Sequence, residues 1–232
     1  MHPLDNPVWQ SLQTRHRGFA RVSGRVVRYP ADVAPFLAVD PAITDHLHAL
    51  AALVDPGESV LIVGPAPVLD ASWQLELLEP IAQMVCEQRI AQAPMPGAGF
   101  IELEAQRRAD LLELTALVYP HYFRPRTPDM GRYIGIYDGS RLAAMAGERM
   151  GFDGHQEISA VCTHADYLGR GLAQRLVTEL TNASLDAGKL PFLHVSNRNV
   201  RAKALYERLG YRQRIDINLW SLKRLPNDGS PP

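Results

Sequence analysis

Residues 155–176 change from strand-like alternation to helical spacing across a turn that contains two glycines, and this change constrains the fold most. Residues 155–163 are expected to form a strand whose side chains face its two sides in turn, and leucines then recur at helical intervals over 172–180. Gly169 and Gly171 stand at the junction. The first N–H groups of such a helix have no internal partner, and the helix dipole adds partial positive charge there. The pattern therefore predicts a phosphate or diphosphate site, to which Arg170 can add a charged contact.

The two glycines do not complete a nucleotide-binding loop of the common kinds. A Walker A loop has Lys and then Ser or Thr after its glycines, and a dinucleotide-binding fingerprint has a third glycine. Leu172, Ala173 and Gln174 follow here instead. The sequence leaves two alternatives open, which are a different phosphate-bearing ligand and an ordinary strand–helix turn.

Strands and helices are expected to alternate around this turn. We expect a helix over 104–119, a hairpin that turns at Asp138-Gly139, the strand 155–163, a helix that ends near Gly188, a strand over 191–196, a helix capped by Asn199 and stopped by Gly210, and a strand over 216–222. This order predicts an α/β or α+β fold with a mixed sheet.

The N-terminal part has fewer clear signals. Residues 59–64 are predicted to form a buried strand, and 45–54 and 75–90 carry apolar residues at helical spacing. His46 and His48 are two residues apart, so on a helix they would point to different faces. This spacing argues against a shared metal ion and favours positions on the surface.

A segment rich in proline and glycine divides the chain. "QAPMPGAGF", residues 92–100, interrupts helical sequence with two prolines and two glycines. We expect an N-terminal α/β region over 1–98, a second domain over 99–225, and a flexible polar tail over 226–232.

Charge and cysteine content exclude several classes of function. The 232 residues carry a formal net charge of −1, which gives no global positive field for nucleic acid or an anionic membrane. Cys86 and Cys162 are too far apart in the sequence for a metal finger or a disulfide framework. The sequence has neither a signal peptide at its start nor an apolar run of about 18 residues. We therefore expect a cytoplasmic protein without metal, nucleic-acid or membrane partners.

Two motifs in this order resemble the GCN5-related N-acetyltransferase (GNAT) superfamily, and within it the FR47-type branch. "EISAVCTHADYLGRGLAQRLV" is similar to the family's acetyl-CoA motif, in which a strand precedes an Arg/Gln-x-x-Gly-x-Gly/Ala turn and a helix. "NVRAKALYERLGY" matches the family's second pattern at Asn199, Ala202, Leu205, Tyr206, Gly210 and Tyr211. The resemblance covers about residues 102–222. It departs at Asp166, where the family usually has Arg or Gln, and at Leu168, where Arg is common.

The resemblance implies a mainly antiparallel sheet flanked by helices and a direct transfer of acetyl from acetyl-CoA to an amine in a ternary complex. The acceptor would be a small molecule or a peptide. The thioester would lie between two splayed strands, 157–163 and 191–196. The implied cofactor contacts are the backbone of Val161, Cys162 and Thr163 for the pantetheine arm, the amides of Gly169, Arg170, Gly171, Leu172 and Ala173 for the diphosphate, and Asn199.

Glu157 is the predicted general base, acting directly or through a water. It is expected on the same strand face as Ser159, Val161 and Thr163, while Ile158, Ala160 and Cys162 share the other face. An ion pair with Arg149 across the hairpin is the alternative, and Glu148 is a weaker candidate for the base.

Tyr206 is the implied general acid, and the alternative is a hydroxyl that only hydrogen-bonds the thioester sulfur. Cys162 is expected to pack in the core rather than to act as a nucleophile, and His164 and His194 are expected to be structural. Arg124, Arg126 and Thr127 either border the acceptor or belong to a rigid loop.

A competing hypothesis is an acyl-CoA-binding sensor or interaction protein that has this fold without turnover. The altered Asp166 and Leu168 favour it, whereas Glu157 and Tyr206 favour catalysis. The N-terminal region would be a degenerate copy of the fold or a lid over the acceptor. The sequence leaves open the acceptor's identity and the oligomeric state, a homodimer included.

Overall fold

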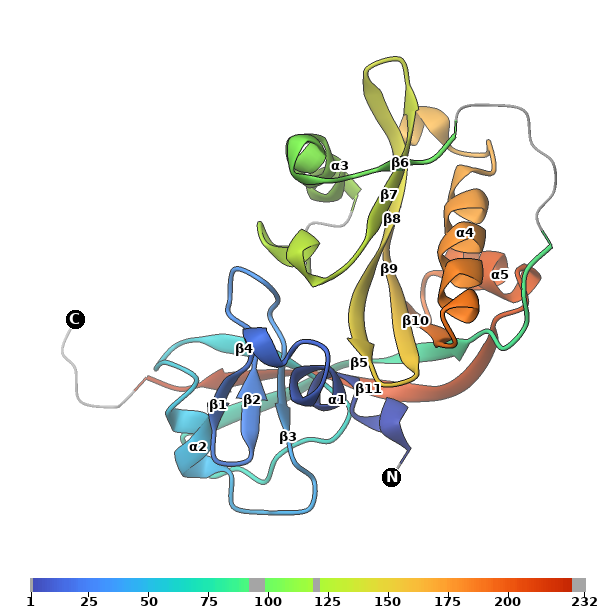
Figure 1. Cartoon of the computed structure of the whole chain (residues 1–232). Coiled ribbons are helices and arrows are strands. Elements are labelled where there is room, and N and C mark those ends of the chain that lie inside the picture. Colours follow the sequence, from blue (N-terminus) through green and yellow to red (C-terminus); the bar gives the residue numbers. More distant parts are fainter. Residues whose placement is uncertain (1, 92–98, 119–121, 227–232) are drawn as a thin grey trace. The chain divides into compact units, whose positions relative to one another are not determined.

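The computed structural model describes residues 2–91, 99–118 and 122–226 (Figure 1), and these fold into two compact units. The first unit takes its described residues from Met1–Ala31, Pro35–Ile81 and Asp216–Pro232. The second comprises Asp32–Ala34 and the described part of Ala82–Ile215. Two long strands, β5 (Trp73–Val85) and β11 (Arg212–Arg224), run from one unit into the other.

This division differs from the boundary expected at 92–100. Residues 92–98 of that boundary, and 227–232 of the expected tail, lie outside the described residues. The chain crosses between the units within β5 and again within β11, whose Leu222 packs in one core with Val60 and Trp73 of the first unit. Local composition does not show that the C-terminal residues 216–226 rejoin the first unit, because this arrangement depends on pairing between residues far apart in the sequence.

The first unit holds two groups of strands. The strands β1 (Arg21–Ser23), β2 (Val26–Arg28) and β3 (Leu37–Val39) form an antiparallel sheet, and β4 (Ser59–Val63) pairs antiparallel with β11, which has β5 on its other side. Its helices are α1 (Pro7–Gln13) and α2 (Leu47–Ala51). The expected strand at 59–64 and the helix within 45–54 are confirmed.

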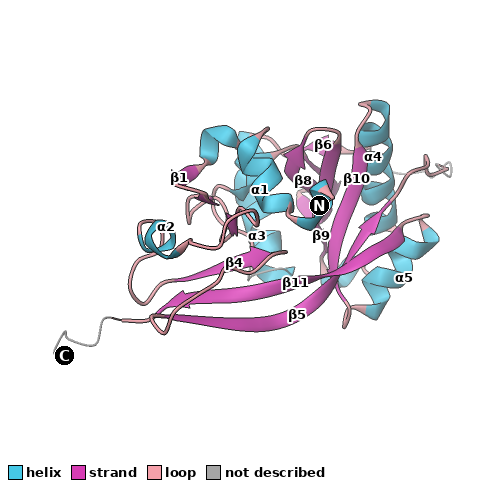
Figure 2. Ribbon diagram, turned by 90° about the horizontal axis from the view of Figure 1, so that it is seen from below, coloured by secondary structure: helices cyan, strands magenta, loops and turns pink. Residues whose placement is uncertain are grey.

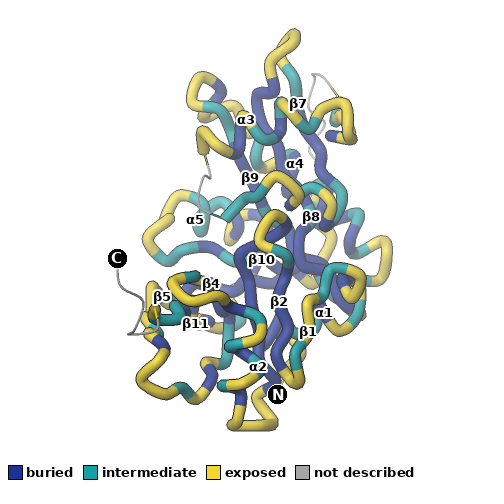
Figure 3. The backbone as a smooth tube through the Cα atoms, turned by 90° about the vertical axis from the view of Figure 1, so that its left-hand side faces the viewer, coloured by how far each residue is buried: buried dark blue, intermediate teal, exposed yellow. Residues whose placement is uncertain are grey.

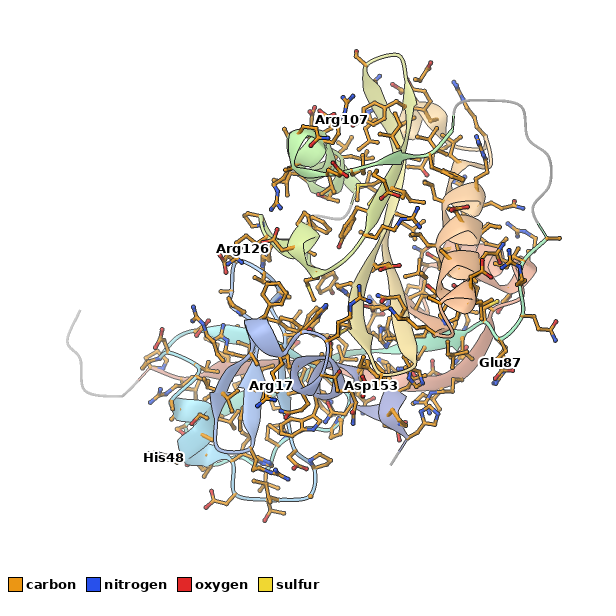
Figure 4. All side chains as sticks on the ribbon, in the orientation of Figure 1. Arg17, His48, Glu87, Arg107, Arg126 and Asp153 are labelled. Carbon is orange, nitrogen blue, oxygen red and sulfur yellow. The ribbon has the colours of Figure 1, made fainter. Side chains whose placement is uncertain are left out.

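Two expectations for the N-terminal part are wrong. Residues 73–85 form strand β5 rather than the helix expected over 75–90, because residues 81–85 are buried throughout and neighbouring strands flank β5 on both sides. Such short apolar runs fit a buried strand as well as a helix. His46 is 3% exposed, and its Nε2 lies 3.0 Å from the Asp40 carbonyl oxygen, while His48 is exposed as expected (Figure 4).

The second unit has the strand order β11-β5-β10-β9-β8-β7-β6. Its own strands are β6 (Ile101–Glu102), β7 (Tyr133–Asp138), β8 (Arg141–Phe152), β9 (His155–Thr163) and β10 (Leu190–Ser196). The pairs β6–β7, β7–β8 and β8–β9 are antiparallel, and β9–β10 is parallel. The predicted fold class, a mixed and mainly antiparallel sheet flanked by helices, is confirmed.

Three helices cover this sheet: α3 (Arg108–Val118), α4 (Leu172–Asp186) and α5 (Val200–Arg208). Leu111 and Leu114 of α3 pack on Met145 of β8, whereas Leu176 and Leu180 of α4 pack on its neighbour Ala146. Successive strand residues face opposite sides of a sheet, so α3 and α4 cover opposite faces (Figure 1). Figure 2 shows the strands and helices by type, and Figure 3 shows β8 and β10 mostly buried.

Short 3₁₀ helices occupy several connections, at Pro3–Asp5, Arg17–Phe19, Ala105–Arg107, Thr127–Met130 and Ala165–Tyr167. The turn at Asp138-Gly139 joins β7 and β8 as expected, and Gly139 has φ +61°. Across the described residues, none of the helices is both long enough and apolar enough to cross a membrane.

Gly147 gives a test of the packing between β7 and β8. It lies directly opposite Tyr133, and a Cβ at Gly147 would overlap the Tyr133 ring. Gly147→Ala should therefore lower the free energy of unfolding by about 1–3 kcal/mol, which is the usual cost of overpacking. Thermal denaturation measures this change. Gly99→Ala is the control, because nothing lies within 4 Å of the added Cβ. An unchanged melting temperature for Gly147→Ala would show that the hairpin packs differently.

Candidate active site

The turn before α4 presents helix N–H groups that no side chain of the described residues caps. Gly171 is the N-cap residue of α4, with φ +71° and no side-chain hydrogen bond at this helix start. Gly169 has φ +79°, and a Cβ built on it would meet nothing within 4 Å. Both glycines therefore adopt backbone conformations that other residues rarely take, and they leave open the space in front of the helix. This is the arrangement that binds anions at helix starts.

A pocket of about 440 Å³ joins this turn to the neighbouring strand and helix. It is lined from β9 by Val161 and Thr163 and from the turn and α4 by residues 167–174. Helix α5 and the residue before it contribute Asn199, Arg201, Ala202, Leu205, Tyr206 and Arg208. Of the predicted cofactor contacts, all except Cys162 line this one pocket.

Strands β9 and β10 separate beside the pocket. Their parallel register has three residue pairs, and the last of these is Glu157 opposite Phe192. Both strands continue past this pair, β9 to Thr163 and β10 to Ser196. The predicted splay of these two strands is therefore confirmed, and it starts at Glu157.

The backbone of Thr163 faces the side from which β10 has departed. The next residue, His164, donates its N–H to the Ala143 carbonyl of β8 at 2.9 Å. Because N–H groups alternate along a strand, the N–H and C=O of Thr163 point away from β8. Cys162, directly opposite Met145, turns its backbone toward β8 instead. Of the backbone contacts predicted for the pantetheine arm, Thr163 is therefore the best placed.

A β-bulge in β9 changes which side chains share a face. Ala160 and Val161 together lie opposite Ala146, and Ala160 has φ +50°, the only positive φ of a non-glycine among the described residues. As a result Val161 packs with Ile158 beside α4, whereas Ala160 and Cys162 pack beside α3. The expected face assignment is wrong, because an extra residue in a strand reverses its alternation. Glu157 and Val161 therefore do not share a face.

Glu157 forms the Arg149 pair that the sequence left as an alternative. Arg149 donates to both carboxylate oxygens, each at 2.8 Å, and the Met150 N–H adds a contact of 3.2 Å. The third donor is His194, whose Nδ1 lies 2.9 Å from Oε1. Glu157 is fully buried, and burial alone would raise the pKa of its carboxyl. The charge and hydrogen bonds of Arg149, together with the hydrogen bond from His194, outweigh burial and hold that pKa at about 2.

The contacts of Glu157 belong to a row of polar side chains that crosses five neighbouring strands. Arg214 of β11 donates to Gln83 Oε1 of β5 at 2.6 Å, and Gln83 Nε2 lies 3.0 Å from His194 Nε2 of β10. Since Arg only donates, the Gln83 oxygen accepts and its NH₂ group donates to His194. His194 therefore carries its proton on Nδ1 and gives that hydrogen bond to Glu157. Every donor in the row points toward the same carboxylate.

Tyr206 and Asn199 lie at the pocket as predicted. Tyr206 is 7% exposed and lines the pocket from α5. The Asn199 Oδ1 accepts the Ala202 N–H at 3.0 Å and so caps α5. This cap occupies the oxygen, so the remaining NH₂ group is the part of Asn199 suited to a ligand.

Asp166 and Leu168, the two residues that depart from the expected motif, differ in their contacts. Asp166 forms an ion pair with Arg141 at 2.9 Å, and its N–H donates to His164 Nδ1 at 3.2 Å. Arg170 lies over the Tyr167 ring, 4.8 Å from the ring centroid, and its Nη2 donates to the Asp166 carbonyl oxygen. Leu168 is 50% exposed at the edge of the pocket. Asp166 therefore contacts Arg141 through its side chain and Arg170 through its backbone carbonyl.

The remaining predicted residues have structural contacts. Thr127 is buried and donates to the Val33 carbonyl oxygen, while Arg126 pairs with Asp129 and Asp32 (Figure 4). These contacts favour the rigid-loop alternative for this segment.

Burial raises the pKa of the Cys162 thiol to about 12, which disfavours a thiolate. Within the part of the chain that the structure describes, no group of three metal-ligating side chains occurs.

Sequence reasoning missed Gln83, Arg214, Arg201 and Arg208. Gln83 and Arg214 lie in two strands far apart in the sequence, and no local pattern brings them together. Arg201 and Arg208 did carry a signal, because they are seven residues apart and so share a helix face with Leu205.

Comparison with known proteins agrees with this geometry. Residues 133–221 match the family described as FR47-like protein. The structure of a protein assigned to the GNAT family of acetyltransferases, from Novosphingobium aromaticivorans DSM 12444, is similar over 97% of this chain and 99% of its own. Its sequence identity is 31% and the TM-score is 0.86.

A second structure is similar in fold. The GCN5-related N-acetyltransferase from Kribbella flavida matches 93% of this chain and 94% of its own length, with 18% identity and a TM-score of 0.60. Among proteins of curated function, none matches the chain.

The buried Glu157–Arg149 pair should contribute strongly to stability. Glu157→Gln leaves the Arg149 charge buried without a counter-ion, which typically costs about 3–5 kcal/mol. Chemical denaturation measures the loss. The control is Asp186→Asn, because Asp186 pairs with Arg89 on the surface, where both side chains are more than half exposed. Equal effects of the two substitutions would contradict the argument.

The same pair predicts a pH dependence. The folded-state pKa of Glu157 lies below its ordinary value of 4.5, so its stabilisation is complete above pH 4.5 and is lost as the pH falls toward 2. The difference in unfolding free energy between wild type and Glu157→Gln should shrink over this range. A difference that stays constant from pH 6 to the acid end would contradict a lowered pKa.

The hydrogen-bond row predicts the tautomer of His194. Long-range ¹H–¹⁵N correlation spectra should show that the His194 proton lies on Nδ1 and that Nε2 is an acceptor. In Gln83→Leu the donor to Nε2 is gone, so the Nε2 chemical shift should change while Nδ1 stays protonated. A proton found on Nε2 in the wild type would show that Gln83 is turned the other way.

Proposed function

The chain belongs to the GNAT family of acetyltransferases, and from this membership we propose that it transfers an acetyl group from acetyl-CoA to an amine acceptor. The observation that carries the proposal is the single pocket in which the separated strand β9, the uncapped start of α4 and the face of α5 meet. An extended ligand with a diphosphate fits this combination, because one end would meet helix amides and the other the free edge of a strand.

The residues present fit acetyl-CoA. The diphosphate would accept hydrogen bonds from the amides of residues 169–173, where no side chain competes for them. The pantetheine arm would pair with the backbone of Thr163, in the manner of an added strand. Asn199 would donate from its NH₂ group.

Acetyl-CoA supplies an activated acetyl thioester when bound. The neutral acceptor amine forms the new C–N bond, the C–S bond breaks, the amine loses a proton and the departing thiolate gains one. Holding the reactants in the right geometry supplies much of the rate enhancement in such reactions. The protein's part is therefore to hold the strands apart and to supply the proton that the departing thiolate gains, while the proton of the amine leaves to water.

We propose a positioning role for Glu157 rather than that of a base. A general base works best when its pKa is near the working pH, and a carboxyl held at about 2 takes up a proton poorly. Glu157 instead fixes β8, β9 and β10 to one another at the last residue pair before β9 and β10 separate.

Tyr206 is the proposed proton donor to the departing thiolate. Tyr206 lines the α5 side of the pocket, and an ordinary tyrosine titrates about 1.5 pH units above a thiol. This difference makes the transfer mildly unfavourable, and the tyrosinate that it leaves must regain its proton before the next turnover.

The alternative function is an acyl-CoA-binding sensor that does not turn over. It rests on Asp166, which pairs with Arg141 at the position where the family usually offers Arg or Gln to the ligand. The class of amine acceptor (a small molecule or a peptide), the cytoplasmic location, the lack of membrane and nucleic-acid partners, and a homodimer stay predictions from the sequence.

The test is thiol release from acetyl-CoA against a panel of small amines and peptide N-termini, with calorimetry of CoA, ATP and NAD beside it. We expect binding of CoA but not of ATP or NAD, and thiol release with some amines. Tight binding of CoA without turnover on any amine would favour the sensor. No affinity for CoA would overturn both functions.

Tyr206→Phe separates the catalytic role from packing. Loss of the proton donor should lower kcat at least about 100-fold, as is usual for general acids, with CoA affinity unchanged. Tyr211→Phe is the matched control, because Tyr211 is buried beside Tyr206 but hydrogen-bonds Thr181 and does not line the pocket. A kcat for Tyr206→Phe equal to that of Tyr211→Phe would leave Tyr206 without a role in proton transfer.

A further inference from the structure

Two arginines of α5 line the pocket without acidic partners. Arg201 and Arg208 are both exposed, and both line the pocket together with Leu205. Their spacing of seven residues is about two helical turns, so they lie on one face of the helix. Within residues 2–91, 99–118 and 122–226, neither of them forms an ion pair with a carboxylate.

Several other exposed arginines of the second unit are neutralised. Arg89 pairs with Asp186, Arg141 with Asp166, and Arg212 with Glu87. The third arginine that lines the pocket, Arg170, lies over Tyr167 and donates to a backbone carbonyl beside the turn. The α5 face is therefore a source of uncompensated positive charge that opens onto the pocket.

The charge of this face exceeds what a diphosphate at the α4 start requires. The amides of that helix start and Arg170 are available for a diphosphate, which carries about two negative charges. Arg201 and Arg208 remain for a further anion on the same ligand, and two guanidinium groups suit a phosphate monoester because each can donate two hydrogen bonds to it. CoA carries such a group on the 3′ position of its ribose.

We infer that Arg201 and Arg208 form a subsite for the 3′-phosphate of CoA, so that the protein selects CoA derivatives over their dephospho forms. This inference rests on the proposed function, since it assigns one part of the same ligand to one side of the same pocket. It makes α5 a specificity element for the co-substrate, in addition to its role of holding Asn199 and Tyr206 at the pocket.

Calorimetry with CoA and with 3′-dephospho-CoA tests the inference on the full chain. The wild type should bind CoA at least about tenfold more tightly, and this ratio should shrink at high salt because the contacts are charged and exposed. In the double variant Arg201→Gln/Arg208→Gln the ratio should fall to about one, while the affinity for 3′-dephospho-CoA stays at the wild-type value.

Lys203→Gln is the matched control. Lys203 is a cation of the same helix, but its Nζ donates to Asn197 Oδ1 and it does not line the pocket. We expect this variant to keep the wild-type ratio, and an equal loss in Lys203→Gln would overturn the subsite in favour of a general charge effect.

The remaining outcomes separate the subsite from the function. Equal wild-type affinity for CoA and 3′-dephospho-CoA would overturn the subsite and leave the proposed transfer standing. A lack of affinity for either compound would overturn the proposed function itself.

Discussion

The second unit depends on one buried carboxylate at the point where two parallel strands stop pairing. Ending a ladder inside a sheet leaves strand edges without partners, and this is costly unless other bonds fix the strands. Glu157 supplies them, because it accepts hydrogen bonds from Arg149 and Met150 of β8 and from His194 of β10. The opening between β9 and β10 is thus a stable feature of the sheet.

The bulge at Ala160 explains how one strand, β9, contributes side chains to the polar row and also to the pocket. Before the bulge β9 turns Glu157 into the polar row, and after it Val161 and Thr163 line the pocket with α5. Without the extra residue, strict alternation would place Val161 on the Glu157 face. The positive φ of Ala160 costs roughly 1 kcal/mol. The strain therefore marks the residue that divides the two halves of the strand.

Local signals predicted most of the second unit, and long-range contacts account for what they missed. The strand 155–163, the glycine turn and the Asn199 cap could be predicted because each follows from a few neighbouring residues. The prediction of a helix over 75–90 was wrong because this segment pairs with strands that are distant in the sequence and so forms a strand. The prediction that Glu157 and Val161 share a strand face was wrong because the sequence does not reveal the β-bulge between them. Both errors depend on pairing between strands, which the sequence of a single segment does not contain.

Asp166 shows how a site can keep its electrostatics when a motif position changes. A carboxylate near the start of α4 would repel a phosphate, and the Debye length of about 8 Å at physiological salt would not screen it there. Arg141 neutralises this charge through a direct ion pair, and Arg170 turns toward the Asp166 backbone. The net potential at the turn then comes from the helix amides, with the arginines of α5 adding to it from the other wall of the pocket. The groups that attract anions to this pocket are therefore the helix amides and the arginines of α5, while Arg141 offsets the carboxylate of Asp166.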